Sequence, residues 1–456
     1  MNAKLAITTL LAGVALLAPQ RAHAFCGLYV GKAGGELYNH ASKVVIVRDD
    51  KRTVLTMSND FQGNLTDFAM VVPVPTLITR EQIHIGDKKL VDRIDNYSAP
   101  RLVKYVDPDP CDERRYSVMK KSMAPASAGR ASDGHVSAGR SEALGVKVEA
   151  EYTVGEYDIV ILSAKQSDGL ETWLKESGYQ VPARASAALQ PYIKQNMKFF
   201  VAKVNLKEQA KTGSSFLRPI QIAYESEKFM LPIRLGMANA DGPQDMLVFT
   251  ITRKGRVESA NYKTVNMPTD ADVPLFVKEE FGKFYKAAFE KTWKANERRA
   301  VMTEYAWNAS WCDPCADTPL NQEELRGLGV FWLDEPQPGY SSGYGYRRGM
   351  AGGQPMITRL HVRYDAEHFP EDLVFQETGD QRNFQARYIL HERFRGNVEC
   401  EAGQQYVKQL AQRHEHEAVS LAELTGWSRD EIVSKMGADA PGKAPTDERW
   451  YKKLWK

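Results

Sequence analysis

The sequence contains few cysteines, no excess of either charge and only one long apolar run. Its 456 residues include five cysteines, 60 basic and 58 acidic side chains. A nucleic-acid-binding protein would carry a clustered basic surface and a high pI, so no nucleic-acid partner is predicted. The longest apolar run, Leu5 to Ala18, is shorter than the roughly 20 residues that cross a bilayer. We therefore expect no transmembrane segment in the mature chain.

The N-terminus is typical of a bacterial export signal. Lys4 precedes the apolar run, Pro19 ends it, and Ala22-His23-Ala24 forms a small-x-small cleavage site. Cleavage after Ala24 would remove two basic residues and no acid, which leaves a neutral mature chain. The expected location is the periplasm or the extracellular medium.

The length of the chain predicts more than one folded part, because single cores rarely exceed about 250–300 residues. The stretch from Ser122 to Gly145 is rich in Ala, Ser and Gly and lacks apolar periodicity, which indicates a flexible linker. The predicted parts are a signal peptide (1–24), a β-rich N-terminal domain (25–112), a linker (113–145), an α+β domain (146–400) and a helical C-terminal segment with its tail (401–456).

Hydrophobic periodicity predicts many strands in neighbouring blocks, with helices between the blocks. The runs at 43–48, 53–58 and 68–74 are spaced as an antiparallel meander, and Pro73 should end the third strand or place it at an edge. Further strands are expected at 146–154, 157–161, 197–206, 219–224, 230–235, 246–253, 357–364, 373–376 and 384–390. Helices are expected at 167–177, at 273–299, from about 402 to the stop at Gly426, and after the capping residue Ser428. This order favours an α+β fold with predominantly antiparallel sheets, inserted helices and a helical C-terminal region.

Several uncommon strings resemble a family of secreted bacterial proteins known as domain of unknown function 2330 (DUF2330). The resemblance runs from the mature N-terminus to about residue 400 and implies an exported bacterial protein, with no established activity or cofactor. The strings that carry it are Phe25 to Lys32, Asn59 to Gly63, Val71 to Pro75, Tyr97 to Leu102, Glu151 to Asp158, Leu231 to Gly236, Trp311 to Cys315 and Phe375 to Thr378.

The segment Trp307 to Cys315 is similar to the thioredoxin active-site pattern Trp-x-x-x-Trp-Cys-x-Pro-Cys. In a redox protein Cys312 would be a thiolate at a helix N-terminus and Cys315 would resolve the mixed disulfide. A segment of helical period precedes the motif here, and any following helix should start at Asn321. We therefore favour a structural Cys312–Cys315 disulfide, with a thiol-disulfide oxidoreductase as the alternative.

Three cysteines, Cys26, Cys111 and Cys400, lie outside this motif. A Cys26–Cys111 pair is favoured among 15 ways of choosing two pairs, because it would tie the mature N-terminus to the end of the first β block. A zinc site would need further ligands, and His361 and Cys400, the candidates in the sequence, are more often core residues. No metal and no cofactor are expected.

Gly339 to Gly343 fits the nucleophile-elbow pattern around Ser341, but a polar, proline-broken segment precedes it instead of a buried strand. A hydrolase is therefore only a third hypothesis. The sequence favours an exported periplasmic or cell-envelope protein, stabilised by disulfides, with a binding or structural role. It does not decide whether the protein is an enzyme. It names no partner, although an envelope protein or glycan would suit that location.

Overall fold

The computed structural model describes most of the chain after residue 27. Cys26, Cys315, the predicted signal peptide and linker, the Gly339–Gly343 loop and the C-terminal tail lie outside the described residues. The described residues are 28–31, 38–62, 68–112, 147–177, 181, 184–211, 217–238, 240, 242–312, 317–333, 354–396 and 398–442.

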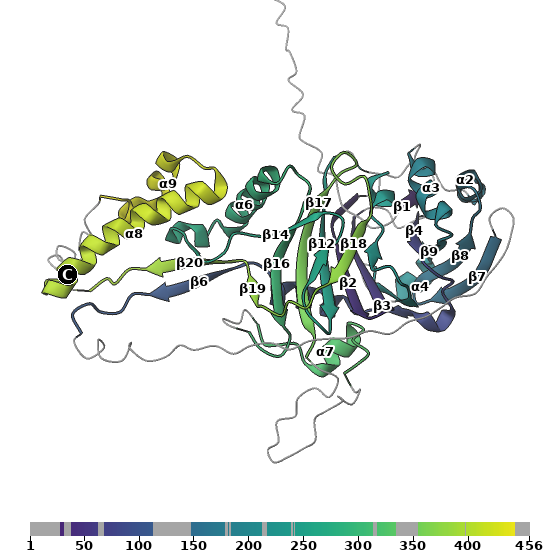
Figure 1. Ribbon diagram of the computed structural model, residues 1–456, viewed down its shortest axis with the longest axis horizontal. Coiled ribbons are helices and arrows are strands. Elements are labelled where there is room, and N and C mark those ends of the chain that lie inside the picture. Colours follow the sequence, from purple (N-terminus) through teal and green to yellow (C-terminus); the bar gives the residue numbers. More distant parts are fainter. Residues whose placement is uncertain are drawn as a thin grey trace, which may run out of the picture.

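The fold is α+β, as the sequence predicts, and its largest element is a nine-stranded sheet (Figure 1). The strand order is β14-β16-β17-β12-β2-β3-β10-β5, and β19 pairs with β16. Only the pairs β2–β12 and β14–β16 are parallel. The strands are β2 (Tyr38–Asp49), β3 (Arg52–Gln62), β5 (Ile83–Ile85), β10 (Ile220–Glu225), β12 (Gln244–Thr252), β14 (Lys263–Asn266), β16 (Ala300–Asn308), β17 (Met356–Tyr364) and β19 (Phe384–Gln385).

A five-stranded antiparallel sheet packs against one face of the larger sheet and completes a sandwich. Its order is β1-β4-β9-β8-β7, and the predicted hairpin is present as β7–β8. The core between the sheets joins residues such as Ile46 and Leu360 to Val72 and Ile161. The strands are β1 (Leu28–Gly31), β4 (Phe68–Val74), β7 (Lys147–Val154), β8 (Tyr157–Ser163) and β9 (Lys198–Val204).

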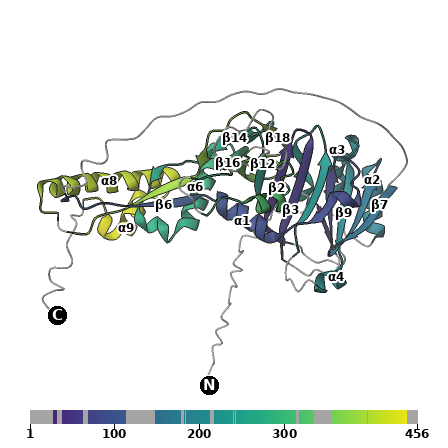
Figure 2. The ribbon, with the colours of Figure 1, turned by 90° about the horizontal axis from the view of Figure 1, so that it is seen from below.

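Helices cover the outer faces of this sandwich. The predicted helix α2 (Ser167–Glu176) and α3 (Ala185–Lys194) bury Leu170 and Leu189 against the five-stranded sheet. On the nine-stranded sheet, α1 (Lys88–Ser98) lies beside β2 and β3 (Figure 2) and buries Ile94 against Val45 and Val47. Because Val44 and Ile46 face the other core, β2 is apolar on both faces.

Several short elements complete the fold. The short helices are α4 (Leu206–Lys211), α5 (Arg234–Met237) and α7 (Gln322–Gly327), with 3₁₀ turns η1 (Arg80–Gln82), η3 (Leu275–Lys278) and η4 (Gly437–Asp439). A three-stranded sheet is formed by β11 (Met230–Leu231), β18 (Leu373–Glu377) and β13 (Val257–Ser259).

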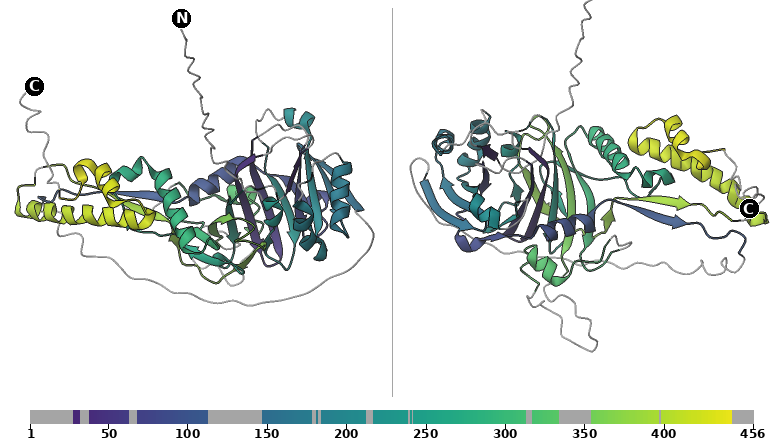
Figure 3. Two further views of the ribbon diagram at one scale, coloured as in Figure 1. Left: turned by 90° about the horizontal axis from the view of Figure 1, so that it is seen from above. Right: turned by 180° about the vertical axis from the view of Figure 1, so that it is seen from behind.

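The remaining elements form a C-terminal lobe that extends away from the sandwich (Figures 1 and 3). Its sheet is parallel, in the order β15-β20-β6, and Tyr388 and Leu390 of β20 pack against the helices. Gly426 ends α8 with a φ of 76°, and the Ser428 side chain caps α9, both as predicted. The lobe comprises β6 (Arg101–Val106), β15 (Ala271–Asp272), β20 (Arg387–Glu392), α6 (Phe281–Ala295), α8 (Glu401–Thr425) and α9 (Arg429–Met436), with η3 and η4.

Three expectations about strand arrangement differ from the structure. The meander is interrupted, because β4 leaves β3 and joins the other sheet between β1 and β9. Pro73 is tolerated there because β1 pairs only with residues 68–71 and leaves the β1 side of Pro73 open. The segment 230–235 contains a two-residue strand followed by α5. The predicted parts 25–112 and 146–400 share their sheets, since each of the two large sheets contains strands from both.

Candidate functional site

A cluster of buried and half-buried charged side chains lies on the outer face of the nine-stranded sheet, and we call it the Glu304 cluster. It consists of Glu304 on β16, Arg359, His361 and Arg363 on β17, and Asp245 on β12. Arg359, His361 and Arg363 alternate along β17, so they share one face while Leu360 and Val362 enter the core on the other. The cluster is therefore a consequence of strand periodicity.

Each charge in this cluster has an opposite partner. Glu304 is 1% exposed; its Oε2 lies 2.5 Å from Arg359 Nε, and its Oε1 lies 2.7 Å from His361 Nδ1. His361 Nε2 is 3.1 Å from Asp245 Oδ1, and Asp245 also accepts two hydrogen bonds from Arg363. Tyr285 of α6 donates a further hydrogen bond to Glu304.

These contacts decide the protonation states. Burial opposes ionisation of Glu304, but the charges of Arg359 and His361 prevail and lower its pKa to about 2. Burial likewise opposes the charge on His361, and Glu304 and Asp245 overcome it and raise the pKa of His361 to about 9. An imidazolium held between two carboxylates is a poor general base. The cluster therefore resembles a structural ionic network more than a catalytic site.

Cys312 follows β16, a buried strand that the sequence analysis did not predict. The expectation that a helical segment leads into the cysteine motif was therefore wrong; the helix α6 ends at Ala295. Cys312 is disulfide-bonded, but its predicted partner Cys315 lies outside the described residues, so that pair stays a prediction.

Among the described residues around Cys312 there is no helix N-terminus of the kind that activates a redox thiol. Cys312 packs against the core beneath α1 and its Sγ lies 3.8 Å from the Asp317 carbonyl oxygen. The residues from Asp317 to Asn321 are not helical, and α7 begins at Gln322 with the predicted capping box between Asn321 and Glu324. The described residues around Cys312 thus supply no specific observation in favour of the oxidoreductase alternative.

The predicted pair Cys26–Cys111 is wrong, because Cys111 is bonded to Cys400. Their Cα atoms are 6.0 Å apart and 289 positions separate them in the sequence. The bond joins the chain just after β6 to the N-cap residue of α8. The prediction failed because β6 runs along β20 into the C-terminal lobe, away from the first β block.

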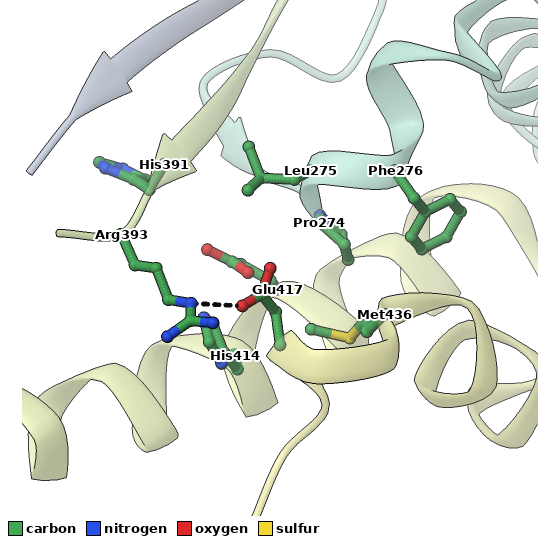
Figure 4. Close-up of a pocket in the computed structure, with 9 residues that line it drawn as sticks. Pro274, Leu275, Phe276, His391, Arg393, His414, Glu417 and Met436 are labelled. Carbon is green, nitrogen blue, oxygen red and sulfur yellow. Dashed lines mark ion pairs between the residues drawn. The ribbon is translucent and has the colours of Figure 1, made fainter. Parts of the chain in front are cut away.

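A small pocket lies in the C-terminal lobe between η3, β20 and the helices (Figure 4). Its volume is about 30 Å³, enough for a few water molecules. In Figure 4 the Glu417 side chain lies between Arg393 and Leu275, and the dashed line marks the ion pair of Arg393 with Asp439, 2.7 Å long. The lining residues are Pro274, Leu275, Phe276, His391, Arg393, His414, Glu417, Met436 and Asp439.

Glu417 is the most perturbed acid of this pocket. It is 3% exposed, and burial raises its pKa to about 8 despite the nearby charge of Arg413. Burial also lowers the pKa of His414, which favours a neutral imidazole. At pH 7 the pocket therefore contains a mostly neutral carboxylic acid beside a neutral histidine.

A larger groove, of about 580 Å³, opens at one end of the sandwich where the β2–β3 turn meets the residues after β10. Beneath it, Arg48 is 7% exposed and donates a hydrogen bond to the Ser226 carbonyl oxygen, which fixes the groove wall. At the rim, Lys51 pairs with Glu227, so charges there are already compensated. The groove is lined by Lys51, Pro75, Thr76, Gln195, Met197, Glu225, Ser226, Glu227, Lys228 and Met230.

The described residues form neither a metal site nor a membrane span. Among the described residues, no three His, Cys, Asp or Glu side chains are grouped so that they could bind a metal ion. Within the same part of the chain, no helix has the length and apolarity needed to span a bilayer. The two suggested zinc ligands are separated by their partners, since Cys400 is bonded to Cys111 and His361 belongs to the Glu304 cluster.

Comparison with known proteins identifies the family. Residues 20–376 match the family described as an uncharacterized protein conserved in bacteria, DUF2330. The chain belongs to this family. No curated protein and no solved structure matches it. The DUF2330 region includes every strand of the two large sheets except β19, and every member of the Glu304 cluster. It ends within β18, so six residues of the pocket lie beyond it: His391, Arg393, His414, Glu417, Met436 and Asp439.

The sequence analysis predicted neither the Glu304 cluster nor the pocket beside Glu417, although the sequence contains a pattern that indicates the Glu304 cluster. Arg359, His361 and Arg363 occupy every second position of a predicted strand, and a charged stripe on a strand within a large chain indicates either solvent or buried partners. Glu304, in an otherwise apolar run, was the matching signal for burial. No such pattern in the sequence indicated that Glu417 is buried, because an acidic residue on a predicted helix is ordinarily exposed.

Proposed function

We propose that this DUF2330 protein is exported to the periplasm or cell envelope and acts there through a binding or structural role. The N-terminal pattern of Lys4, an apolar run and a small-x-small site supports export. The disulfide supports a protein that works outside the cytosol.

The Cys111–Cys400 disulfide is the observation that carries this proposal. It fastens α8 to the end of β6, at the part of the C-terminal lobe farthest from the sandwich (Figure 1). Disulfides persist in oxidising compartments and are kept reduced in the cytosol. A protein whose outlying lobe is fastened in this way suits the periplasm.

A binding role is supported by what the described residues offer. The charges of the Glu304 cluster satisfy one another, which suits a scaffold, while the pocket beside Glu417 and the groove beside Lys51 are hollows lined by both polar and apolar side chains. Pockets with a few placed polar groups are the usual form of small-ligand sites.

The location can be tested by fractionating bacteria that express the full chain with a C-terminal tag. We expect a periplasmic product that begins at Phe25, together with a Cys111–Cys400 crosslinked peptide in non-reducing peptide mapping. A Leu10→Arg variant, which places a charge in the apolar run, should stay cytosolic with its N-terminus uncut. A wild-type product found uncleaved in the cytosol would contradict the proposal.

A further inference from the structure

The pocket in the C-terminal lobe is built around an acceptor without a donor. Glu417 is 3% exposed, and within the described part of the chain its Oε1 receives no hydrogen bond. Arg413 Nε is 3.5 Å away but also makes none, because Asp107 holds the two terminal nitrogens of Arg413. A buried polar atom left unpaired costs about 1–3 kcal/mol, so it indicates where a ligand group fits.

The charges around Glu417 favour a cation at this point. Three aspartates raise the pKa of Glu417, after burial: Asp272, Asp439 and Asp107. The two arginines are already engaged, Arg393 with Asp439 and Arg413 with Asp107. Ionised Glu417 would therefore be a fourth carboxylate beside two arginines, and its own ion pair with Arg413 is the longer one, at 3.5 Å. The titratable and charged groups that face it are Asp107, Asp272, His391, Arg393, Arg413, His414 and Asp439.

The rest of the lining and the size of the pocket restrict what the cation can be. Leu275, Phe276, Pro274 and Met436 form an apolar wall suited to methylene groups. The cavity of about 30 Å³ takes only a few non-hydrogen atoms, which excludes an organic cofactor. Since no three ligating side chains meet among the described residues, a metal ion is not favoured.

We propose that the pocket binds a primary ammonium group on a short alkyl stem, with the ammonium donating to Glu417 and the stem lying against Leu275 and Met436. The ammonium could belong to a small free amine or to a lysine side chain of a peptide. This inference rests on the proposed binding role and names the ligand chemistry of one site.

Binding is linked to a proton. The neutral Glu417 carboxyl loses its proton to solvent, and the resulting carboxylate pairs with the ammonium, so charge and atoms balance. With a Glu417 pKa of about 8, roughly a tenth of the sites are ionised at pH 7, and the affinity should be about tenfold higher at pH 9. Alkylamines remain charged there, because ammonium groups like that of lysine have a pKa of about 10.4.

The test is calorimetric titration of the oxidised, purified full-length chain with ethylammonium chloride at pH 7 and pH 9, in two buffers of different ionisation enthalpy. We expect saturable binding, release of close to one proton at pH 7 and little at pH 9. Sodium acetate and sodium chloride should give no saturable heat. An acetylated, amidated lysine peptide separates the sources: binding at least as tight as ethylammonium assigns a protein side chain, and its exclusion assigns a free amine.

Two matched variants locate the site. Glu417→Gln should weaken ethylammonium binding at pH 9 at least tenfold and abolish the pH dependence, whereas Glu415→Gln, whose partner Arg429 lies outside the pocket, should bind as the wild type does. Absence of saturable binding at pH 9, equal binding of acetate, or undiminished binding by Glu417→Gln would overturn the inference. If Glu417→Gln does not fold, the proton release of the wild-type protein decides. Fractionation tests the location of the protein and calorimetry tests ligand binding. The proposal of export and the proposal of an ammonium site can therefore fail independently.

Discussion

Glu304 shows how this protein accommodates a buried charge on the outer face of the nine-stranded sheet. An isolated carboxylate at 1% exposure would become protonated, but Arg359 and His361 supply two cations at hydrogen-bond distance. Removing one partner of such a network leaves the other charge uncompensated, which costs about 3–5 kcal/mol. The network is therefore a stabilising feature only as long as all its members keep their charges.

His361 makes the stability of the fold depend on pH. Its pKa is raised from 6.5 to about 9 in the folded protein, so its contribution is fully present below pH 6.5 and is lost as the pH rises through 9. We expect the free energy of unfolding, measured with urea, to fall about 3 kcal/mol more between pH 6 and pH 10 in the wild type than in His361→Gln.

Glu417 has a pKa that is also raised, and a control separates the two effects. Its contribution is present below about pH 4.5 and is lost as the pH rises through about 8. In a Glu417→Gln variant, the free energy of unfolding should therefore no longer decrease as the pH rises through about 8. The decrease that depends on His361, near pH 9, should remain. Parallel pH curves for the wild type and His361→Gln would contradict the assigned role of the imidazolium.

The helix ends are fixed by residues that the sequence displays. Asn321 and Glu324 cap α7 reciprocally, and Ser428 caps α9 by accepting a hydrogen bond from the Glu431 N–H. At the C-terminal end of α8, Gly426 has a φ of 76°, a conformation in which a side chain strains the backbone. These signals were legible because each involves residues within one turn of the chain.

Gly426 and Gly282 provide a matched pair of substitutions. A Cβ at Gly426 would meet only Lys291 Cδ, at 4.0 Å, so Gly426→Ala should destabilise by about 1 kcal/mol through backbone strain alone. Gly282 lies in the first turn of α6 with open space around it, and Gly282→Ala should be neutral or stabilising by up to about 1 kcal/mol. Thermal unfolding checks both, and a Gly426→Ala variant as stable as the parent would refute the strain argument.

The period-two pattern predicted which segments are strands, but it did not predict which sheet each strand joins. The β7–β8 hairpin was predictable because a two-residue connection at Gly155 fixes its register. The passage of β4 from one sheet to the other was not, since its partners β1 and β9 are distant in sequence. The strand β16 was missed because it follows the amphipathic run of α6 after only a short turn.

The C-terminal lobe depends on contacts that close over long stretches of chain. Its sheet joins β6 to β20, which lie almost 300 residues apart, and the Cys111–Cys400 bond fastens the same two regions. Such a crosslink stabilises by restricting the unfolded chain, typically by 2–4 kcal/mol. The lobe should accordingly be the part of the molecule most sensitive to reduction.

Replacement of both cysteines tests this expectation. In the Cys111→Ala/Cys400→Ala variant we expect hydrogen exchange in α8 to accelerate strongly while β17, in the centre of the large sheet, keeps its protection. The single variant Cys111→Ala should behave like the double variant, because either change removes the same bond. Unchanged exchange in α8 would show that the helix is held by its apolar contacts alone.

The sequence predicted most of the secondary structure, the α+β class and the helix caps. Period-two runs and capping residues depend only on neighbours a few positions away. The family was legible too, because its strings are local. The partner of Cys111, the meeting of Glu304 with His361 and the burial of Glu417 required the folded chain. Each of these depends on side chains from strands and helices far apart in sequence, whose distances are set by the path of the whole backbone.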